Sequence, residues 1–311
     1  MMAKSRAGDL PRARLGILTA SALAVATNVT SVEALGLLGG IAAAFVLEFL
    51  NDTIKTGEDV KTKLGVACLG KILRQHSKIP LTEELEDAKS GISEAYSAVF
   101  AALRFSGGGA PTALLVTSAY PGEGKSSSVL ALSQNYARRG ERVLLIDADL
   151  RRPAFKGTSK AKGLTTLLTS DESINSHVIA TQHENLWLLP CGPIAPNPAD
   201  LLASPRFGAI LTEAKEDFDR VMVDGPATLG LADASFLAAF VGEVMMVVES
   251  GRTRTRCVHE AIERITDSGA HVVGVTITKA VAEASRKGRE VYRHSTAFAS
   301  VPYAMITLAR E

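Results

Sequence analysis

The chain has 311 residues, a formal net charge of +1 at pH 7 and 46% hydrophobic residues. This length holds one full-size domain with accessory segments, and a net charge so close to zero gives no global field toward nucleic acid, so we expect no nucleic-acid partner. Cys68, Cys191 and Cys257 lack the paired spacing of a zinc site or a redox couple. We expect them to be buried apolar side chains in a reducing cytoplasm.

Two apolar runs crowd the N-terminus, at residues 15–26 and 34–50. Each is shorter than the about 20 residues of a membrane-spanning helix, whereas one helix over both runs would place Asn28 and Glu33 near mid-membrane, which is costly. Positive residues on both sides favour a helical hairpin with both ends in the cytoplasm; a single membrane helix over 34–50 is the other arrangement. We expect residues 1–50 to be a membrane anchor, with a secretory signal or two buried soluble helices as alternatives.

Residues 51–109 turn polar and show helical patterns. Thr82, followed by Glu83 and Glu84, is typical of a capped helix start, and residues 92–103 carry apolar side chains at helical spacing. The glycines of residues 106–111 then break the helix. These features predict a helical connecting segment that ends at a domain boundary near residue 109.

The apolar run at residues 113–117 predicts a buried strand, and a glycine-rich turn follows it. The turn leads into a helical stretch through residue 139, and this order is the context that a P-loop requires. Backbone amides at the helix start would face phosphates, Lys125 would neutralise the β- and γ-phosphates, and the Ser126 hydroxyl would bind Mg²⁺. Ala119 stands where such loops usually have their first glycine.

Two further apolar strands end in carboxylates. Residues 143–146 lead into Asp147 and Asp149, and residues 218–223 lead into Asp224. Carboxylates at the carboxyl ends of parallel strands lie where open α/β sheets bind ligands. A single aspartate there can equally be a helix cap or a turn residue, but the three elements in this order predict a nucleotide site with Mg²⁺ near Ser126.

The rest of this region alternates between helices and strands. Residues 232–241 and 254–267 predict helices, and residues 243–249 and 271–278 predict strands. We therefore expect residues 110–282 to form an α/β, P-loop NTPase-like domain, with a mostly parallel sheet and helices on both faces. We expect residues 283–311 to form a C-terminal tail.

The motifs at residues 121–126, 147–153 and 224–226 resemble the Walker A, A′ and B motifs of the bacterial tyrosine kinases of capsule and exopolysaccharide biosynthesis. Residues 50–56, 189–193, 196–202 and 232–234 are also similar to that family, so the resemblance covers roughly residues 34–279. It implies an ATP-dependent tyrosine autokinase, which phosphorylates in trans within a homo-oligomeric ring. It also implies a role in polysaccharide export at the bacterial inner membrane, with the kinase domain facing the cytoplasm and polysaccharide co-polymerase or export proteins as partners.

The same resemblance implies roles for individual residues. Asp147 is the candidate base for the tyrosine hydroxyl, Asp149 supports metal and phosphate geometry, and Asp224 holds Mg²⁺ through water. The candidate metal site comprises Ser126, Asp147 and Asp224, and Lys125 joins the three aspartates as a catalytic candidate. The candidate nucleotide-binding residues are Pro121, Gly122, Glu123, Gly124, Lys125, Ser126, Ser127 and Arg151. Tyr292 and Tyr303 are the candidate phosphoacceptors in the tail.

Three departures from the family pattern keep two other functions open. Ser97 and Phe100 follow Glu94 where the family's Glu-x-x-Arg-x-x-Arg assembly motif has arginines, the tail has few tyrosines, and the chain has no room for a large extracytoplasmic domain. A non-catalytic nucleotide-binding regulatory subunit is one alternative. The other is a switch ATPase like the septum-positioning and plasmid-partition proteins, but Tyr120 replaces their signature lysine.

Overall fold

The computed structural model describes residues 36–43, 45, 52–74, 81–87, 89–105, 109–155 and 162–281. The chain divides into two compact units, Met1–Asp52 and Thr53–Glu311. In the first unit, residues 36–43 are helical, and Leu37 and Leu38 are exposed. None of the helices in the described ranges combines the length and the apolar character needed to cross a bilayer. The run 15–26 and part of the run 34–50 lie outside the described residues, so the membrane anchor stays a prediction.

The second unit is built on an eight-stranded sheet in the order β1-β8-β7-β2-β6-β3-β5-β4. Neighbouring strands are parallel except for β4 and β5. The strands are β1 Cys68–Leu73, β2 Ala113–Ser118, β3 Val143–Asp147, β4 Ile179–Ala180, β5 Leu186–Leu189, β6 Arg220–Asp224, β7 Glu243–Glu249 and β8 His271–Ala280. The expected P-loop NTPase-like fold with a mostly parallel sheet is confirmed.

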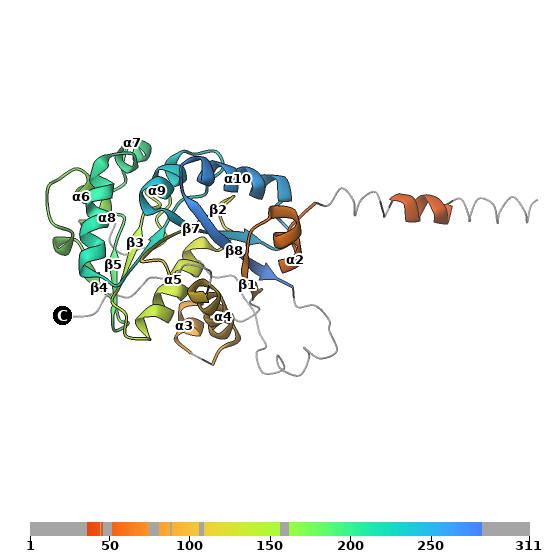
Figure 1. The fold of residues 1–311 in the computed structure, drawn as a ribbon, viewed down its shortest axis with the longest axis horizontal. Coiled ribbons are helices and arrows are strands. Elements are labelled where there is room, and N and C mark those ends of the chain that lie inside the picture. Colours follow the sequence, from red (N-terminus) through yellow and green to blue (C-terminus); the bar gives the residue numbers. More distant parts are fainter. Residues whose placement is uncertain are drawn as a thin grey trace, which may run out of the picture. The chain divides into compact units, whose positions relative to one another are not determined.

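Helices cover both faces of this sheet (Figure 1). One face carries α3 Leu81–Glu86, α4 Gly91–Phe105 and α5 Lys125–Ala137. The other face carries α6 Leu164–Leu168, α7 Pro198–Leu202, α8 Pro205–Asp217, α9 Asp233–Val241 and α10 Thr255–Asp267. Shorter turns are α2 Gly57–Asp59, a π-helical turn Val60–Leu64 and a 3₁₀ turn Ile174–Ser176.

Burial on both faces explains why the central strands are apolar throughout. In β2, Leu114 and Val116 pack against the layer of α4 and α5, whereas Leu115 packs against the opposite layer. The same alternation occurs in β3, where Leu145 and Ile146 face opposite layers. A strand covered on both faces needs apolar side chains at odd and even positions alike.

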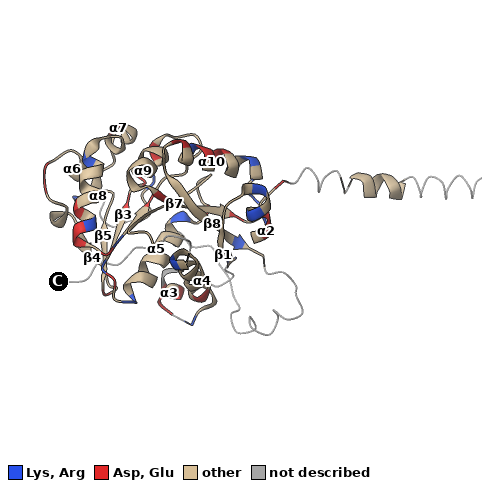
Figure 2. Cartoon of the chain, in the orientation of Figure 1, with Lys and Arg blue, Asp and Glu red and all other residues tan. Residues whose placement is uncertain are grey.

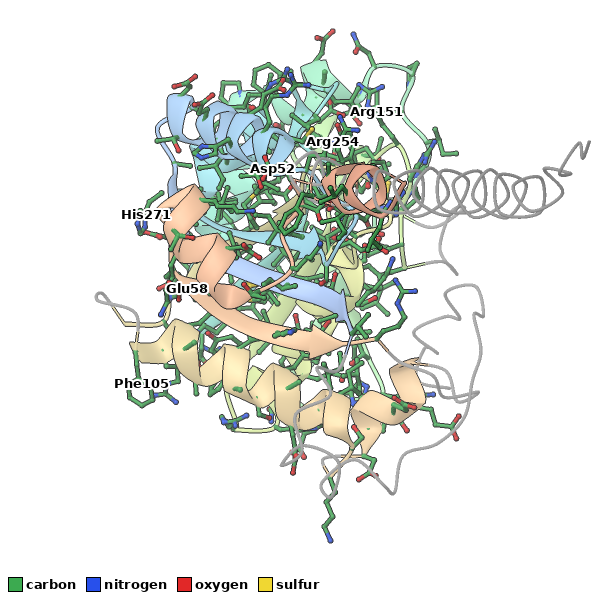
Figure 3. All side chains as sticks on the ribbon, turned by 90° about the vertical axis from the view of Figure 1, so that its right-hand side faces the viewer. Asp52, Glu58, Phe105, Arg151, Arg254 and His271 are labelled. Atoms are coloured by element: carbon green, nitrogen blue, oxygen red, sulfur yellow. The ribbon has the colours of Figure 1, made fainter. Side chains whose placement is uncertain are left out.

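Strand β1 is the main difference from the sequence-based expectation, because a helical segment was predicted over residues 51–109. Instead β1 pairs in parallel with β8, and α4 lies along it, with Phe105 at the helix end pointing away from the body (Figure 3). Gly70 permits this packing, since a Cβ there would lie 2.6 Å from Cγ2 of Val99. The segment thus supplies β1, the short turns before it and the helices α3 and α4 to the compact unit that begins at Thr53.

Basic and acidic residues are interspersed over the described helices, α10 among them (Figure 2). This mixture agrees with the near-zero net charge of the sequence. The three cysteines are free: Cys191 is buried, whereas Cys68 and Cys257 are only half-buried.

Candidate active site

The carboxyl ends of β2, β3 and β6 meet at one edge of the sheet. Strand β6 lies between β2 and β3, and Asp224 is in register with Val116 on one side and Asp147 on the other. Helix α5 begins at Lys125, directly after the turn that follows β2. The topology therefore brings one lysine together with the three aspartates that the sequence singled out. We call these four residues the carboxylate cluster: Lys125, Asp147, Asp149 and Asp224.

The turn between β2 and α5, residues 119–125, is called here the phosphate loop. Gly122 and Gly124 have φ angles of 85° and 98°, in the left-handed region that side chains with a Cβ rarely adopt. Gly124 is the N-cap of α5, and its carbonyl accepts the Ser128 amide at 2.9 Å. The first amides of α5 therefore lie at the sheet edge, where a helix N-terminus attracts anions.

Lys125 is a buried cation held by two of the aspartates. Its Nζ donates to Oδ2 of Asp149 at 2.8 Å and lies 3.9 Å from Oδ1 of Asp224. Burial alone would lower the pKa of Lys125, but the charges of Asp224 and Asp149 outweigh it and raise the pKa. Lys125 is therefore charged at neutral pH, as a phosphate-binding lysine must be.

The two strand-end aspartates are buried without full hydrogen bonding. Asp147 accepts the amides of Ala154 and Phe155 on Oδ2, each at 3.1 Å. Its Oδ1 and both side-chain oxygens of Asp224 accept no hydrogen bond within the described part of the chain. Burial, with the charge of Asp224, raises the pKa of Asp147 to about 8. Burial also raises the pKa of Asp224 to about 6, although the nearby charge of Lys125 lowers it.

These oxygens fit a hard divalent cation. Buried carboxylate oxygens without donors are costly unless a cation satisfies them, and Mg²⁺ prefers oxygen ligands from one or two carboxylates together with waters and phosphates. The described residues contain no cluster of three or more His, Cys, Asp or Glu side chains arranged as a protein-only metal cage. Ser126, Asp147 and Asp224 therefore suit a metal site that is completed by a nucleotide.

Two residues expected to contact nucleotide have other partners. The buried Glu123 carboxylate accepts the Tyr120 amide at 2.6 Å, the Glu249 amide at 3.2 Å and the Thr253 hydroxyl. Through these hydrogen bonds the Glu123 side chain braces the phosphate loop from within the protein.

Arg151, labelled in Figure 3, binds both side-chain oxygens of Asp233, with Nε at 2.6 Å and Nη2 at 3.1 Å. Asp233 is buried at the start of α9, so this bidentate pair ties the segment after β3 to helix α9. The Ala232-Asp233-Ala234 motif was visible in the sequence, but its pairing with Arg151 was not predicted.

The remaining predicted residues are distributed as follows. Pro121 and Gly122 are exposed on the phosphate loop, Ser126 is buried at the start of α5, and Ser127 beside it is half-buried. Tyr292 and Tyr303 lie outside the described residues.

The sequence did not predict three further residues beside the phosphate loop, Thr278, Lys279 and Glu249. Thr278 and Lys279, at the end of β8, donate hydrogen bonds to loop carbonyls, and Glu249 ends the neighbouring β7. The available signal was their place at the carboxyl ends of β7, which flanks β2, and of β8 beside β7.

A lysine-bearing loop between a parallel strand and a helix, opposed by strand-end aspartates, defines a P-loop nucleotide-binding protein. In agreement with this class, a family model described as an AAA domain matches residues 115–268.

The chain is similar to several named proteins. It is 34% identical over 185 residues to tyrosine-protein kinase YwqD of Bacillus subtilis (strain 168), covering 58% of this chain and 74% of that protein. It is 32% identical over 200 residues to tyrosine-protein kinase CpsD of Streptococcus agalactiae, covering 63% and 86%. The crystal structure of the chimerical protein CapA2B2 matches with a TM-score of 0.66 and 30% identity, covering 73% of this chain and all of that one. The chain therefore belongs to the family of bacterial tyrosine-protein kinases, as its motifs indicated.

Proposed function

We propose that this chain binds Mg·ATP at the carboxylate cluster and transfers the γ-phosphoryl group to tyrosine hydroxyls of other copies of itself. The observation that carries this proposal is the pairing of a buried, charged lysine with buried carboxylate oxygens that accept no hydrogen bond within the described residues. Such an arrangement favours a ligand that brings both negative phosphates and a cation. Membership of a tyrosine kinase family supports the phosphoryl acceptor.

In the proposed reaction, the chain mainly positions groups and neutralises charge. Lys125 would contact the β- and γ-phosphates from the start of α5. Ser126, Asp147 and Asp224 would hold Mg²⁺, which when bound supplies positive charge beside the phosphates. The tyrosine oxygen forms a bond to the γ-phosphorus as the bond to the β–γ bridging oxygen breaks, and ADP leaves.

Asp147 is the proposed acceptor of the tyrosine proton. A general base works best when its pKa lies near the working pH, and burial raises the pKa of Asp147 to about 8. The backbone amides of Ala154 and Phe155 hold Oδ2 of Asp147 and so fix the orientation of this carboxylate. Asp149 would act indirectly, by holding Lys125 in place.

The proposed setting is the bacterial inner membrane, with residues 1–50 as the anchor and the kinase domain in the cytoplasm. There the chain would regulate polymerisation and export of capsule or exopolysaccharide together with polysaccharide co-polymerase or export proteins. Transfer in trans requires a homo-oligomer, and Tyr292 and Tyr303 are the proposed acceptors in the tail.

The test is to incubate the purified chain with Mg·ATP, map phosphotyrosine by mass spectrometry and measure phosphate release in parallel. We expect phosphate on Tyr292 or Tyr303 in the native protein and none in Lys125→Met. Lys215→Met, at an exposed position of α8, is the matched control and should stay active. Phosphate release without phosphotyrosine would indicate a switch ATPase, and nucleotide binding without either would indicate a regulatory subunit.

A further inference from the structure

Lys279 has an unusual backbone conformation. Among the described residues other than glycine, Asn185 and Lys279 have positive φ angles, at 62° and 51°. Asparagine tolerates the left-handed region, but for lysine it costs about 1–2 kcal/mol. Strain of this kind persists where the surrounding structure demands it and is enriched at functional sites.

The strain has a visible consequence for side-chain direction. In a regular strand, successive side chains point to opposite faces. At the end of β8, however, two successive side chains reach the same loop: Oγ1 of Thr278 donates to the Glu123 carbonyl at 2.5 Å, and Nζ of Lys279 donates to the Gly122 carbonyl at 2.6 Å. The left-handed turn at Lys279 breaks the alternation and lets neighbouring residues hold neighbouring carbonyls.

The carboxylate of Glu249 also holds the amine of Lys279. Its Nζ lies 3.0 Å from Oε2 of Glu249, which accepts Nη1 of Arg252 at 2.9 Å. Burial alone would raise the pKa of Glu249, but the hydrogen bonds from Arg252 and Lys279 lower it, so the carboxylate is charged. The Glu249 amide in turn donates to Glu123. The amine of Lys279 is therefore oriented by a buried anion toward the phosphate loop.

Fixing a carbonyl also fixes the next amide. In a trans peptide the C=O of one residue and the N–H of the following residue point in opposite directions. The chain has no cis peptide bond in its described part, so holding the carbonyls of Gly122 and Glu123 toward β8 turns the amides of Glu123 and Gly124 away from it. Successive amides that point to one side form an anion-binding nest.

We propose that Thr278 and Lys279 form a carbonyl clamp, which presets the phosphate loop for ATP by holding its carbonyls away from the phosphates. Lys279 is then a positioning residue, acting on the nucleotide through the loop and not by touching it. This inference rests on the proposed binding of Mg·ATP at the same loop.

The decisive variant is Lys279→Gly, because glycine relieves the backbone strain while removing the amine. We expect the ligand-free protein to unfold at the same or a higher temperature, whereas its Kd for Mg·ADP and its KM for ATP rise about tenfold, the size of effect expected from losing a charge-assisted hydrogen bond. Its kcat at saturating ATP should stay near the native value, since a clamp prepares the loop and takes no part in the chemistry.

Two variants separate the amine from the backbone. Lys279→Met keeps the strain and removes the donor, so it should lose as much nucleotide affinity as Lys279→Gly. Lys279→Arg keeps a charged donor and should bind close to normally. Thr278→Val should weaken binding while Thr278→Ser preserves it, because only the latter retains the hydroxyl.

The outcomes distinguish the clamp from the proposed function. If the native chain binds Mg·ADP but Lys279→Gly and Lys279→Met bind it equally well, the clamp is wrong and the kinase proposal stands. Parallel losses of affinity and of apo stability in Lys279→Gly would also overturn it, because they would show a general structural role. If the native chain binds no nucleotide, the proposed function fails and the clamp fails with it.

Discussion

Buried carboxylates lie on both sides of the phosphate loop, but they differ in whether the protein donates hydrogen bonds to their oxygens. On one side, Asp147 and Asp224 are buried with oxygens that accept no hydrogen bond among the described residues. On the other side, both oxygens of the buried Glu123 accept hydrogen bonds, and Glu249 faces Arg252 and Lys279. A buried carboxylate whose oxygens accept hydrogen bonds from the protein has a structural role, whereas a buried carboxylate without such donors suits a ligand.

The strongest test of this contrast is Asp147→Asn. If Asp147 takes the tyrosine proton, the amide should reduce kcat about 10²–10⁴-fold, the range that general-base catalysis contributes. Single-turnover transfer of labelled phosphate to the chain measures this loss. A variant that keeps full kcat would remove Asp147 from the chemistry and leave it a structural residue.

On the satisfied side, Glu123→Gln should act on stability. The amide keeps the shape but replaces one acceptor oxygen by a donor that meets further donors, so we expect a loss of about 1–3 kcal/mol in the free energy of unfolding. Urea unfolding of the nucleotide-free protein measures it. A stable Glu123→Gln variant with greatly weakened ATP binding would instead place this carboxylate at the nucleotide.

The pH dependence of stability tests the side of the phosphate loop that carries Asp147 and Asp224. Folding raises the pKa of Asp147 from 3.8 to about 8 and that of Asp224 from 3.8 to about 6. The native state then holds protons that the unfolded chain has lost, so stability falls as pH rises from about 4 to 8.

Asp147→Asn should flatten this decline and be more stable than the native chain at pH 8 by about 0.5–2 kcal/mol, the usual gain from relieving an active-site conflict. Thermal unfolding in EDTA between pH 5 and 9 measures both curves. A decline of equal steepness in the two proteins would mean that Asp147 is ionised throughout.

The smallest effect is expected for Arg151→Lys. Lysine cannot reproduce the bidentate contact with Asp233, and because the pair is partly exposed we expect a loss of only about 0.5–1 kcal/mol in stability. The KM for ATP should change little. A large rise in KM with unchanged stability would return Arg151 to the nucleotide-binding role that the sequence predicted.

Much of the fold could be read from the sequence because the central strands are buried on both faces. The runs at residues 143–146 and 244–248 are apolar at every position. Strand β1 was missed because it lies at the sheet edge and contains Gly70 and Lys71, which break any apolar run. Its identity as a strand depends on β8, about 200 residues later in the chain.

The motif residues of the site were found for a related reason: a strand end and a glycine-rich turn are local features. What the pattern could not show is where each charge is directed. Glu123 belongs to the same motif as Lys125, yet its carboxylate turns to Glu249 and Thr253. The contact of Lys279 with the phosphate loop could not be predicted, because it depends on a left-handed backbone that is set by tertiary packing.

The pairing of β1 with β8 also bears on the order of events during synthesis. Strand β1 is made early, but the strand beside it ends at Ala280 and is the last of the described sheet to leave the ribosome. Contacts this distant in sequence close late in folding. Because the same late strand carries Thr278 and Lys279, a nascent chain completes its sheet and its nucleotide loop together, so a truncated translation product ending before residue 271 would lack both.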